Sequence, residues 1–365
     1  MNLNNMKILQ VIPDLGLGGG AEVMCQSLSK ELLKERGNEI VVATLFSWHT
    51  KITDDLEKEG ISVYFLDKKH GVDLSLVPKL YRIIKKHKID VVHTHRYALQ
   101  YAVPASIMAG VKMRVHTVHN VADKEMGKNK RLLAKTFYRF FHVVPVAISP
   151  IIKDSISYEY KLKAEKIPMI YNGIDLAKCK EKKLYDLSTP VEVVHLGRMT
   201  NQKNQMEIFK AASILKDRNL NIHFSLYGEG ELENDYKREV LRMKLENEIS
   251  FCGLSDNIYP ILQKADIFIL PSKYEGMPIS LIEAMGSALP IIASNVGGIP
   301  DMISDGENGI IISPNANDLA DAISRLIKDQ DLRQILGHKA KQDSNRFSSY
   351  FMAQEYLNVY REKRE

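Results

Sequence analysis

Two glutamates with seven residues between them, Glu275 and Glu283, bracket the expected start of a helix within residues 265–288. An apolar run, a turn and then Pro278 predict a buried strand that leads into this helix. The first backbone NH groups of a helix have no partner within it, and they bind phosphate and other anions. We expect three such groups here, those of Ile279, Ser280 and Leu281.

The two carboxylates suit the sugars that accompany a phosphate. Glu283, inside the helix, can accept both hydroxyl hydrogens of a vicinal diol on its two oxygens. Glu275, in the preceding loop, can reach whatever the helix start holds. An anion site beside a diol acceptor indicates a nucleotide sugar, and the alternative is an ordinary strand–loop–helix unit with solvated glutamates.

Two cations follow another predicted strand, at residues 191–196. Arg198 comes directly after Gly197, and Lys203 comes five residues later. Either charge alone would be ordinary surface chemistry, but the pair beyond a buried strand suits a diphosphate. A short strand at 249–251 is followed by Leu254, where the base of a nucleotide could stack.

Strands and helices alternate along the whole chain, which predicts an α/β fold of two doubly wound parallel sheets. In such sheets, ligands bind beyond the carboxyl ends of the strands. We place an N-terminal domain at 1–171, a C-terminal domain at 172–346 and a polar linker at 178–190. The predicted strands lie at 7–12, 40–46, 61–66, 89–93, 113–117, 143–147, 191–196, 222–227, 249–251, 267–270, 291–293 and 309–312.

The first predicted strand is followed by a glycine-rich loop in which Gly16, Gly18 and Ala21 fit the dinucleotide pattern G-x-G-x-x-A. That pattern also requires an acid near the end of the second strand, and residues 44–47 contain none, which argues against NAD. Gly18 and Gly19 instead allow the backbone to approach another ligand closely.

Two histidine pairs stand at or near predicted strand ends: His93 with His95, and His116 with His119. Four histidines could bind a metal ion, but no acid accompanies them at ligand spacing, so we expect no metal site. His119 lies beyond its strand, at the mouth of the sheet, and is the better candidate for substrate contact.

Composition is that of a soluble globular protein, with 365 residues of which 45% are hydrophobic, and the sequence shows no signal peptide and no membrane span. Three separated cysteines indicate reduced thiols in the cytoplasm. Residues 1–170 hold 26 Lys and Arg against 17 Asp and Glu, so this half could face anionic lipid, nucleic acid or an anionic substrate, or be a solvated surface.

The segment 126–142 is the most basic aromatic stretch, and two interpretations remain open for it. It could lie on the anionic inner face of the plasma membrane, or it could be a domain helix whose apolar face points inward.

Together these motifs resemble the retaining glycosyltransferases of family 4, whose GT-B fold has two Rossmann-like domains facing across a cleft. The paired glutamates with an upstream Arg/Lys pair are the specific part of the resemblance. The matching residues follow the family's order over nearly the whole chain: Gly18, Gly19, Arg198, Lys203, Glu275, Glu283 and the GGIPD loop at 297–301.

The resemblance implies a role for each matching position. Arg198 and Lys203 would hold the donor diphosphate, and Glu283 would bind the ribose hydroxyls. Glu275, helped by the helix start, would hold the transferred sugar, while His119 would lie beside that sugar. Gly19 would approach the phosphate from the N-terminal domain, which is the acceptor side, and a final helix at 347–365 would pack back onto that domain.

The implied activity is transfer of a sugar from a nucleoside diphosphate donor, with UDP preferred, to a glycan or lipid-linked acceptor in cell-envelope or exopolysaccharide synthesis. We expect no metal of the Asp-x-Asp type, no other cofactor and no nucleic-acid partner, because Arg198, Lys203 and the helix start can stabilise the leaving diphosphate. The alternatives are a nucleotide-sugar epimerase of the same fold and a non-catalytic nucleotide-sugar binding protein. The sugar, the base and the acceptor stay open.

Overall fold

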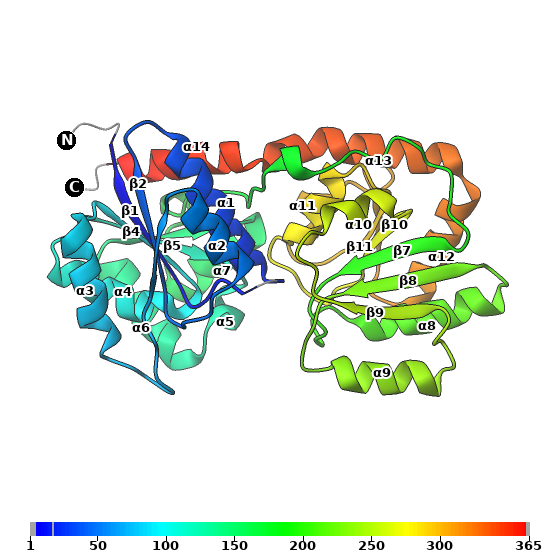
Figure 1. Cartoon of the computed structure of the whole chain (residues 1–365), viewed down its shortest axis with the longest axis horizontal. Helices are drawn as coiled ribbons and strands as arrows, with labels where there is room; N and C mark the ends of the chain where they lie inside the picture. The colour runs from blue at the N-terminus through cyan, green and yellow to red at the C-terminus, as the bar shows by residue number, and fades with distance from the viewer. Residues whose placement is uncertain (1–4, 17, 363–365) are drawn as a thin grey trace. The chain divides into compact units, whose positions relative to one another are not determined.

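The computed structural model describes residues 5–16 and 18–362, and the chain divides into two compact units (Figure 1). Unit 1 comprises Met1–Gly173 with Ser349–Glu365, and unit 2 comprises Ile174–Ser348. Each unit contains one parallel six-stranded sheet. The predicted doubly wound α/β fold is therefore confirmed.

The sheet of unit 1 has the strand order β3-β2-β1-β4-β5-β6. Its strands are β1 (Lys7–Ile12), β2 (Glu39–Thr44), β3 (Ser62–Phe65), β4 (Val91–His95), β5 (Met113–Val118) and β6 (Val143–Ala147). Its helices are α1 (Gly20–Lys34), α2 (Lys51–Lys58), α3 (Leu76–His87), α4 (Leu99–Met108), α5 (Ala122–Glu125), α6 (Lys128–Phe140), α7 (Pro150–Tyr160) and α14 (Ser349–Arg361).

The sheet of unit 2 repeats this topology with the order β12-β11-β10-β7-β8-β9. Its strands are β7 (Val191–Leu196), β8 (Ile222–Tyr227), β9 (Ile249–Gly253), β10 (Ile267–Leu270), β11 (Ile291–Ser294) and β12 (Ile310–Ile312). Its helices are α8 (Gln205–Asp217), α9 (Glu233–Arg242), α10 (Tyr259–Lys264), α11 (Ile279–Gly286), α12 (Ala316–Lys328) and α13 (Gln330–Ser344).

In both sheets the chain reverses its direction of winding between the first and fourth strands of the unit. β1 therefore lies beside β4 in unit 1, and β7 lies beside β10 in unit 2. At such a switch point the loops after the two strands diverge and leave a crevice at the carboxyl edge, where ligands bind. Topology thus brings the loop after β7 next to the loop after β10.

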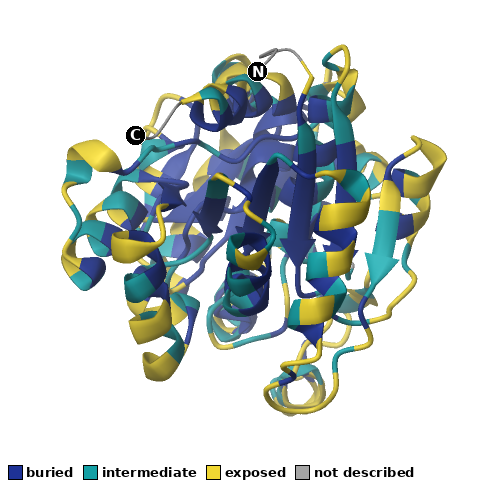
Figure 2. Cartoon of the chain, turned by 90° about the vertical axis from the view of Figure 1, so that its left-hand side faces the viewer, coloured by how far each residue is buried: buried dark blue, intermediate teal, exposed yellow. Residues whose placement is uncertain are grey.

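Burial explains why the strands could be predicted from the sequence. They are covered on both faces, so apolar runs such as Ile267–Leu270 are buried throughout, whereas most helices alternate buried and exposed positions (Figure 2). The strand expected at 89–93 is displaced, since β4 runs from Val91 to His95 and both histidines lie within it. The backbone NH of Asp90 instead donates to the carbonyl of Lys7, the first residue of β1.

The prediction of a linker at 178–190 is wrong, because this polar segment packs on unit 2. Lys182 is buried, and its ammonium lies 3.3 Å from a carboxylate oxygen of the buried Asp266. The Tyr185 hydroxyl donates to the Ala288 carbonyl at 2.8 Å. Charged residues can be part of a core when each finds a partner, and the sequence pattern does not reveal such partners.

Helix α14 belongs to unit 1, where it packs on α1. Its inward face is apolar and aromatic, with Tyr356 and Tyr360 both buried. The final residues of the expected helix, 363–365, lie outside the described residues.

Candidate active site

The carboxyl ends of β7 and β10 bring a lysine and a glutamate of unit 2 together. Lys203 Nζ lies 2.7 Å from Glu275 Oε1, and both side chains are largely buried, with 15% and 6% exposed. The Ser272 hydroxyl donates to the same oxygen at 2.6 Å. The two sequence-predicted residues therefore form one charge-assisted pair, held by a third residue that the sequence did not suggest.

The loop at 297–301 fixes the backbone beside this pair. Gly298 NH donates to the Glu275 carbonyl at 3.3 Å. Gly297 has φ +58°, and a Cβ atom there would lie 1.8 Å from the same carbonyl oxygen. Only glycine allows this approach, so the GGIPD loop determines where Glu275 lies.

Helix α11 starts at Ile279, with Pro278 as its N-cap residue rather than within its first turn. The Leu281 NH donates to the Pro278 carbonyl at 3.2 Å, so the expectation of a free NH is wrong for this residue. A proline N-cap leaves its carbonyl pointing along the helix, where it closes the first turn. Among the described residues, the NH groups of Ile279 and Ser280 have no acceptor and remain available to an anion.

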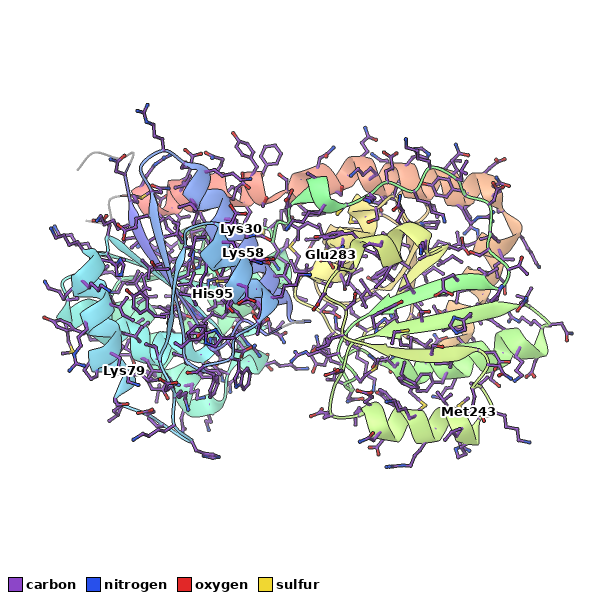
Figure 3. All side chains as sticks on the ribbon, in the orientation of Figure 1. Lys30, Lys58, Lys79, His95, Met243 and Glu283 are labelled. Atoms are coloured by element: carbon purple, nitrogen blue, oxygen red, sulfur yellow. The ribbon has the colours of Figure 1, made fainter. Side chains whose placement is uncertain are left out.

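Glu283 lies on the next turn of α11 and is buried (Figure 3). Burial raises the pKa of its carboxyl from the ordinary 4.5 to about 8. Burial chiefly, and the Glu283 carboxylate to a smaller extent, raises the pKa of the nearby Cys179 and Tyr259 side chains. No hydrogen-bond donor to this carboxylate is found in the described parts of the chain, so a diol could supply the missing donors.

Arg198 and Leu254 are exposed at the same edge of the sheet. The Arg198 backbone is held by Gln205, whose side-chain amide donates to its carbonyl at 2.8 Å. Within the described residues the guanidinium has no ion-pair partner, and it is therefore free to bind a phosphate oxygen.

In unit 1 the switch point lies between the loop after β1 and the end of β4. Gly18 is exposed, and Gly19 makes room for the carboxylate of Glu22, because a Cβ there would lie 1.9 Å from its Oε2. The Arg96 guanidinium binds Glu22 Oε1 at 2.7 Å. Glu22 and Arg96 were not suggested by the sequence, since neither stands in a recognisable pattern.

His119 follows β5 and bonds to His95, with 3.1 Å between His119 Nε2 and His95 Nδ1. Burial lowers the pKa of both imidazoles, that of His95 to about 3, so both are neutral at physiological pH. Burial raises the pKa of the nearby Glu125 carboxyl to about 7, although the backbone NH groups of His119 and Asn120 act in the opposite direction. Glu125 ends helix α5, and no motif in the sequence pointed to this acid.

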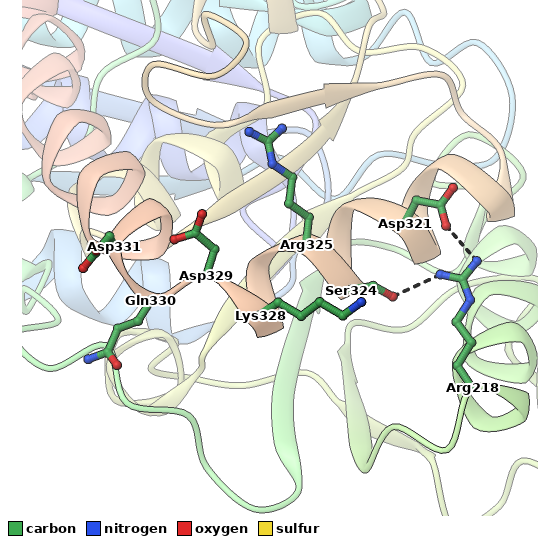
Figure 4. A pocket seen from close by; sticks show the side chains of 8 residues that line it. All are labelled: Arg218, Asp321, Ser324, Arg325, Lys328, Asp329, Gln330 and Asp331. Atoms are coloured by element: carbon green, nitrogen blue, oxygen red, sulfur yellow. Dashed lines mark hydrogen bonds and ion pairs between the residues drawn. The ribbon is translucent and has the colours of Figure 1, made fainter.

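The residues described contain no group of three or more His, Cys, Asp or Glu side chains placed to hold a metal ion. An Asp-x-Asp sequence does occur, at 329–331. Asp329 caps α13 by accepting the Leu332 NH, and it lines a surface hollow together with Arg218 and Asp321, which form an ion pair (Figure 4). This hollow lies where α12 ends, at the amino edge of the sheet and away from Lys203.

Two doubly wound units in tandem, with these polar groups at their switch points, have the architecture of GT-B glycosyltransferases. Solved structures share this fold. A glycosyltransferase from Rickettsia africae superposes with a TM-score of 0.80 over 98% of both chains at 24% identity. HepE from Anabaena, solved with UDP and glucose, gives 0.84 over 97% of this chain and 99% of that one at 22% identity.

Sequence comparison gives the family. Residues 18–178 match the model of Glycosyltransferase Family 4, and residues 180–343 match that of Glycosyl transferases group 1. An Escherichia coli UDP-Gal:alpha-D-GlcNAc-diphosphoundecaprenol alpha-1,3-galactosyltransferase is 30% identical over 300 residues, 76% of each chain. A Bacillus anthracis N-acetyl-alpha-D-glucosaminyl L-malate synthase is 26% identical over 94% of this chain and 93% of its own. The chain belongs to the group 1, family 4 glycosyltransferases.

Proposed function

We propose that this glycosyltransferase is a retaining, metal-independent enzyme that moves a hexosyl group from a UDP-sugar to a lipid-linked or glycan acceptor of the cell envelope or an exopolysaccharide. The observation that carries the proposal is the Lys203–Glu275 pair beside the two free NH groups at the start of α11. A cation and a helix start stabilise negative charge, and negative charge develops on the departing diphosphate.

Each residue then has a distinct task. Lys203 and Arg198 bind the diphosphate oxygens, and the NH groups of Ile279 and Ser280 bind the same anion. Glu283 accepts the two ribose hydroxyls. Glu275 binds a hydroxyl of the transferred sugar through Oε2, which Lys203 does not bond and to which the Gln202 amide donates one long hydrogen bond of 3.5 Å. In a same-face transfer the leaving phosphate accepts the proton of the attacking hydroxyl, so the protein need not supply a base.

The names of relatives support the choice of substrates. The E. coli relative takes UDP-galactose and acts on a diphosphoundecaprenol-linked sugar. A Campylobacter jejuni relative, 32% identical over 54% of this chain, is a transferase for N,N'-diacetylbacillosaminyl-diphospho-undecaprenol. A Staphylococcus aureus relative acts in capsular polysaccharide biosynthesis.

A donor and acceptor panel tests the proposal directly. We expect release of UDP from at least one UDP-sugar, dependent on a polyprenyl-diphosphate-linked or glycan acceptor, with the anomeric configuration of the donor kept in the product by NMR. Glu275→Ala and Arg198→Ala should each abolish most of this release. Formation of an isomer without acceptor would support an epimerase instead, and donor binding without any turnover would support a non-catalytic role.

We further propose that α6 attaches unit 1 to an anionic membrane. Its inward face, with Phe137 and Tyr138, is buried, while a second apolar face is exposed, with 68% of Leu132 and 70% of Phe140 accessible. Lysines and arginines flank this exposed face, among them Lys128 and Arg139. Exposed apolar groups among cations fit a surface of anionic lipid. The described residues contain no helix that is long and apolar enough to cross a membrane.

Vesicles containing phosphatidylglycerol should bind the protein, and binding should weaken as salt is raised. Replacing both Leu132 and Phe140 with glutamine should lower the partition coefficient at least about tenfold, because two apolar side chains no longer insert. Leu241→Gln, which changes another exposed leucine, in unit 2, should leave binding unchanged. Cosedimentation measures all three, and equal binding by the double variant and the wild type would contradict the assignment.

A further inference from the structure

A hydrogen-bonded pair of buried side chains, His195 and Gln205, connects two strands of unit 2 to the loop that carries Arg198. His195 is on β7, and its Nδ1 lies 3.1 Å from the carbonyl oxygen of Ile269 on the neighbouring β10. Gln205 is the first residue of α8, and its side-chain nitrogen lies 3.2 Å from His195 Nε2 and 2.8 Å from the Arg198 carbonyl oxygen. The pair therefore joins the switch point of the sheet to the backbone of Arg198.

The direction of each hydrogen bond follows from the carbonyl group of Ile269. A carbonyl oxygen only accepts hydrogen bonds, so the imidazole hydrogen of His195 is on Nδ1. Burial lowers the pKa of this imidazole to about 4, so the ring is neutral at physiological pH and Nε2 carries a lone pair. Nε2 consequently accepts one hydrogen of the Gln205 amide, and the Arg198 carbonyl accepts the other.

These two acceptors fix the orientation of the Gln205 amide. Turning the amide by half a rotation would place its oxygen against the lone pair of His195 Nε2 and the carbonyl oxygen of Arg198, where no hydrogen is available. In the observed orientation Oε1 is buried, and it has no donor among the described residues. A buried amide oxygen without a donor is unfavourable for folding, and features of this kind concentrate at functional sites.

The backbone on both sides of Arg198 is fixed by the end of β8. The Gly197 NH donates to the Tyr227 carbonyl at 2.9 Å, and the Met199 NH donates to the Glu229 carbonyl at 3.1 Å. The amide described above adds the Arg198 carbonyl to this set. The Arg198 guanidinium is exposed and has no ion-pair partner in the described parts of the chain. Its position therefore depends on how firmly its own backbone is held.

We propose that Gln205 and His195 are positioning residues for the transfer reaction: the histidine orients the amide, and the amide holds the Arg198 backbone so that the guanidinium meets the departing diphosphate. This inference rests on the proposed function, in which Arg198 binds that diphosphate. A cation that is already in place when charge develops stabilises the charge without further rearrangement. Loss of the amide should therefore reduce activity through Arg198.

Nitrogen-15 NMR of the ligand-free protein labelled at histidine tests the hydrogen bonds without any assay of activity. The His195 resonances are identified by their absence from His195→Leu. In the wild type we expect hydrogen on Nδ1 and a hydrogen-bonded lone pair on Nε2. Gln205→Leu should keep this tautomer and shift the Nε2 resonance toward that of a free lone pair. Hydrogen on Nε2 in the wild type, or an unchanged Nε2 resonance in Gln205→Leu, would overturn the inference.

A double-mutant cycle with Arg198→Met separates positioning from a purely structural role. Gln205→Leu should lower kcat/KM for the donor about tenfold in the wild-type background, mainly through kcat, and less than about twofold in the Arg198→Met background. His195→Leu removes the orienting acceptor but leaves the bond between Gln205 and Arg198, so it should show the same dependence with a smaller effect. Tyr185→Phe removes another buried donor to a backbone carbonyl of unit 2 and should change kcat/KM in neither background.

The cycle also separates the inference from the function on which it rests. Equal losses from Gln205→Leu in both backgrounds would show that the amide supports the fold in general, and the inference would be wrong. Full activity of Arg198→Met would instead overturn the proposed diphosphate site, whichever tautomer His195 adopts. If Gln205→Leu does not fold, His195→Leu takes its place in the cycle, and the same two outcomes decide.

Discussion

Replacing Lys203 with methionine is expected to lower kcat/KM for the nucleotide-sugar donor by about 10²–10³-fold, the effect of removing one preorganised charge from a developing anion. The same change should also destabilise the protein by about 2–4 kcal/mol, because it leaves the largely buried carboxylate of Glu275 without its cation. Steady-state kinetics and urea unfolding of the same preparations measure the two effects.

Arg198→Met is the informative partner of this variant. Arg198 is exposed and has no ion-pair partner among the described residues, so its loss should reduce kcat/KM to a similar extent while changing the free energy of unfolding by less than about 0.5 kcal/mol. Lys210→Met, which removes an exposed lysine paired with Glu207 on α8, should change neither.

The pattern across the three variants decides between a site and a structural salt bridge. If Lys203→Met loses stability but keeps its kcat/KM, the pair with Glu275 serves the fold and the proposed diphosphate site is wrong. If Arg198→Met is fully active, the cations do not act together on the leaving group.

Glu283→Gln is expected to make the protein more stable at pH 8.5 and no more stable at pH 4. Burial raises the pKa of the folded-state carboxyl to about 8, above the ordinary value of 4.5 that the unfolded chain should show. Below pH 4.5 the group is protonated in both states, so it does not change the free energy of unfolding. Between pH 4.5 and 8 the folded state holds a proton that the unfolded state has lost, so wild-type stability falls as pH rises.

Glutamine carries no charge to bury, so the variant avoids this loss. One pKa unit corresponds to about 1.4 kcal/mol, so the rise from 4.5 to about 8 gives an expected gain on the order of 4–5 kcal/mol at pH 8.5. Urea unfolding of wild type and variant from pH 4 to 8.5 measures the difference between them, and effects of all other titrating groups cancel in that difference. A difference that does not change with pH would show that Glu283 is solvated.

The same substitution should weaken binding of the nucleotide. A carboxylate accepts both hydroxyl groups of a ribose, whereas glutamine offers one oxygen, so the Kd for UDP should rise about tenfold or more at pH 8.5. Isothermal titration calorimetry measures this, and 2',3'-dideoxy-UDP is the matched ligand, since it should bind both proteins equally. A variant that gains stability and loses affinity identifies Glu283 as a group kept for ligand rather than for folding.

The local sequence pattern was enough to predict much of the fold. The strands at 7–12, 143–147, 191–196, 222–227 and 267–270 have the bounds that the sequence predicts. They do so because each is an apolar run covered on both faces and closed by glycine, proline or polar residues. Candidate ligand-binding residues after those strands could be predicted for the same reason, since polar residues directly beyond a buried strand lie at the edge of the sheet where ligands bind.

Neighbours along the chain are enough to identify which segments are buried strands and which residues follow them. The folded structure was needed to show that Lys203 bonds Glu275 across 72 positions and that Arg96 bonds Glu22 across 74. It also decided that α11 leaves two NH groups free rather than three and that the polar segment at 178–190 packs on unit 2. Strand order and the burial of single ionisable groups depend on segments far apart in the chain, and no local pattern carries that information.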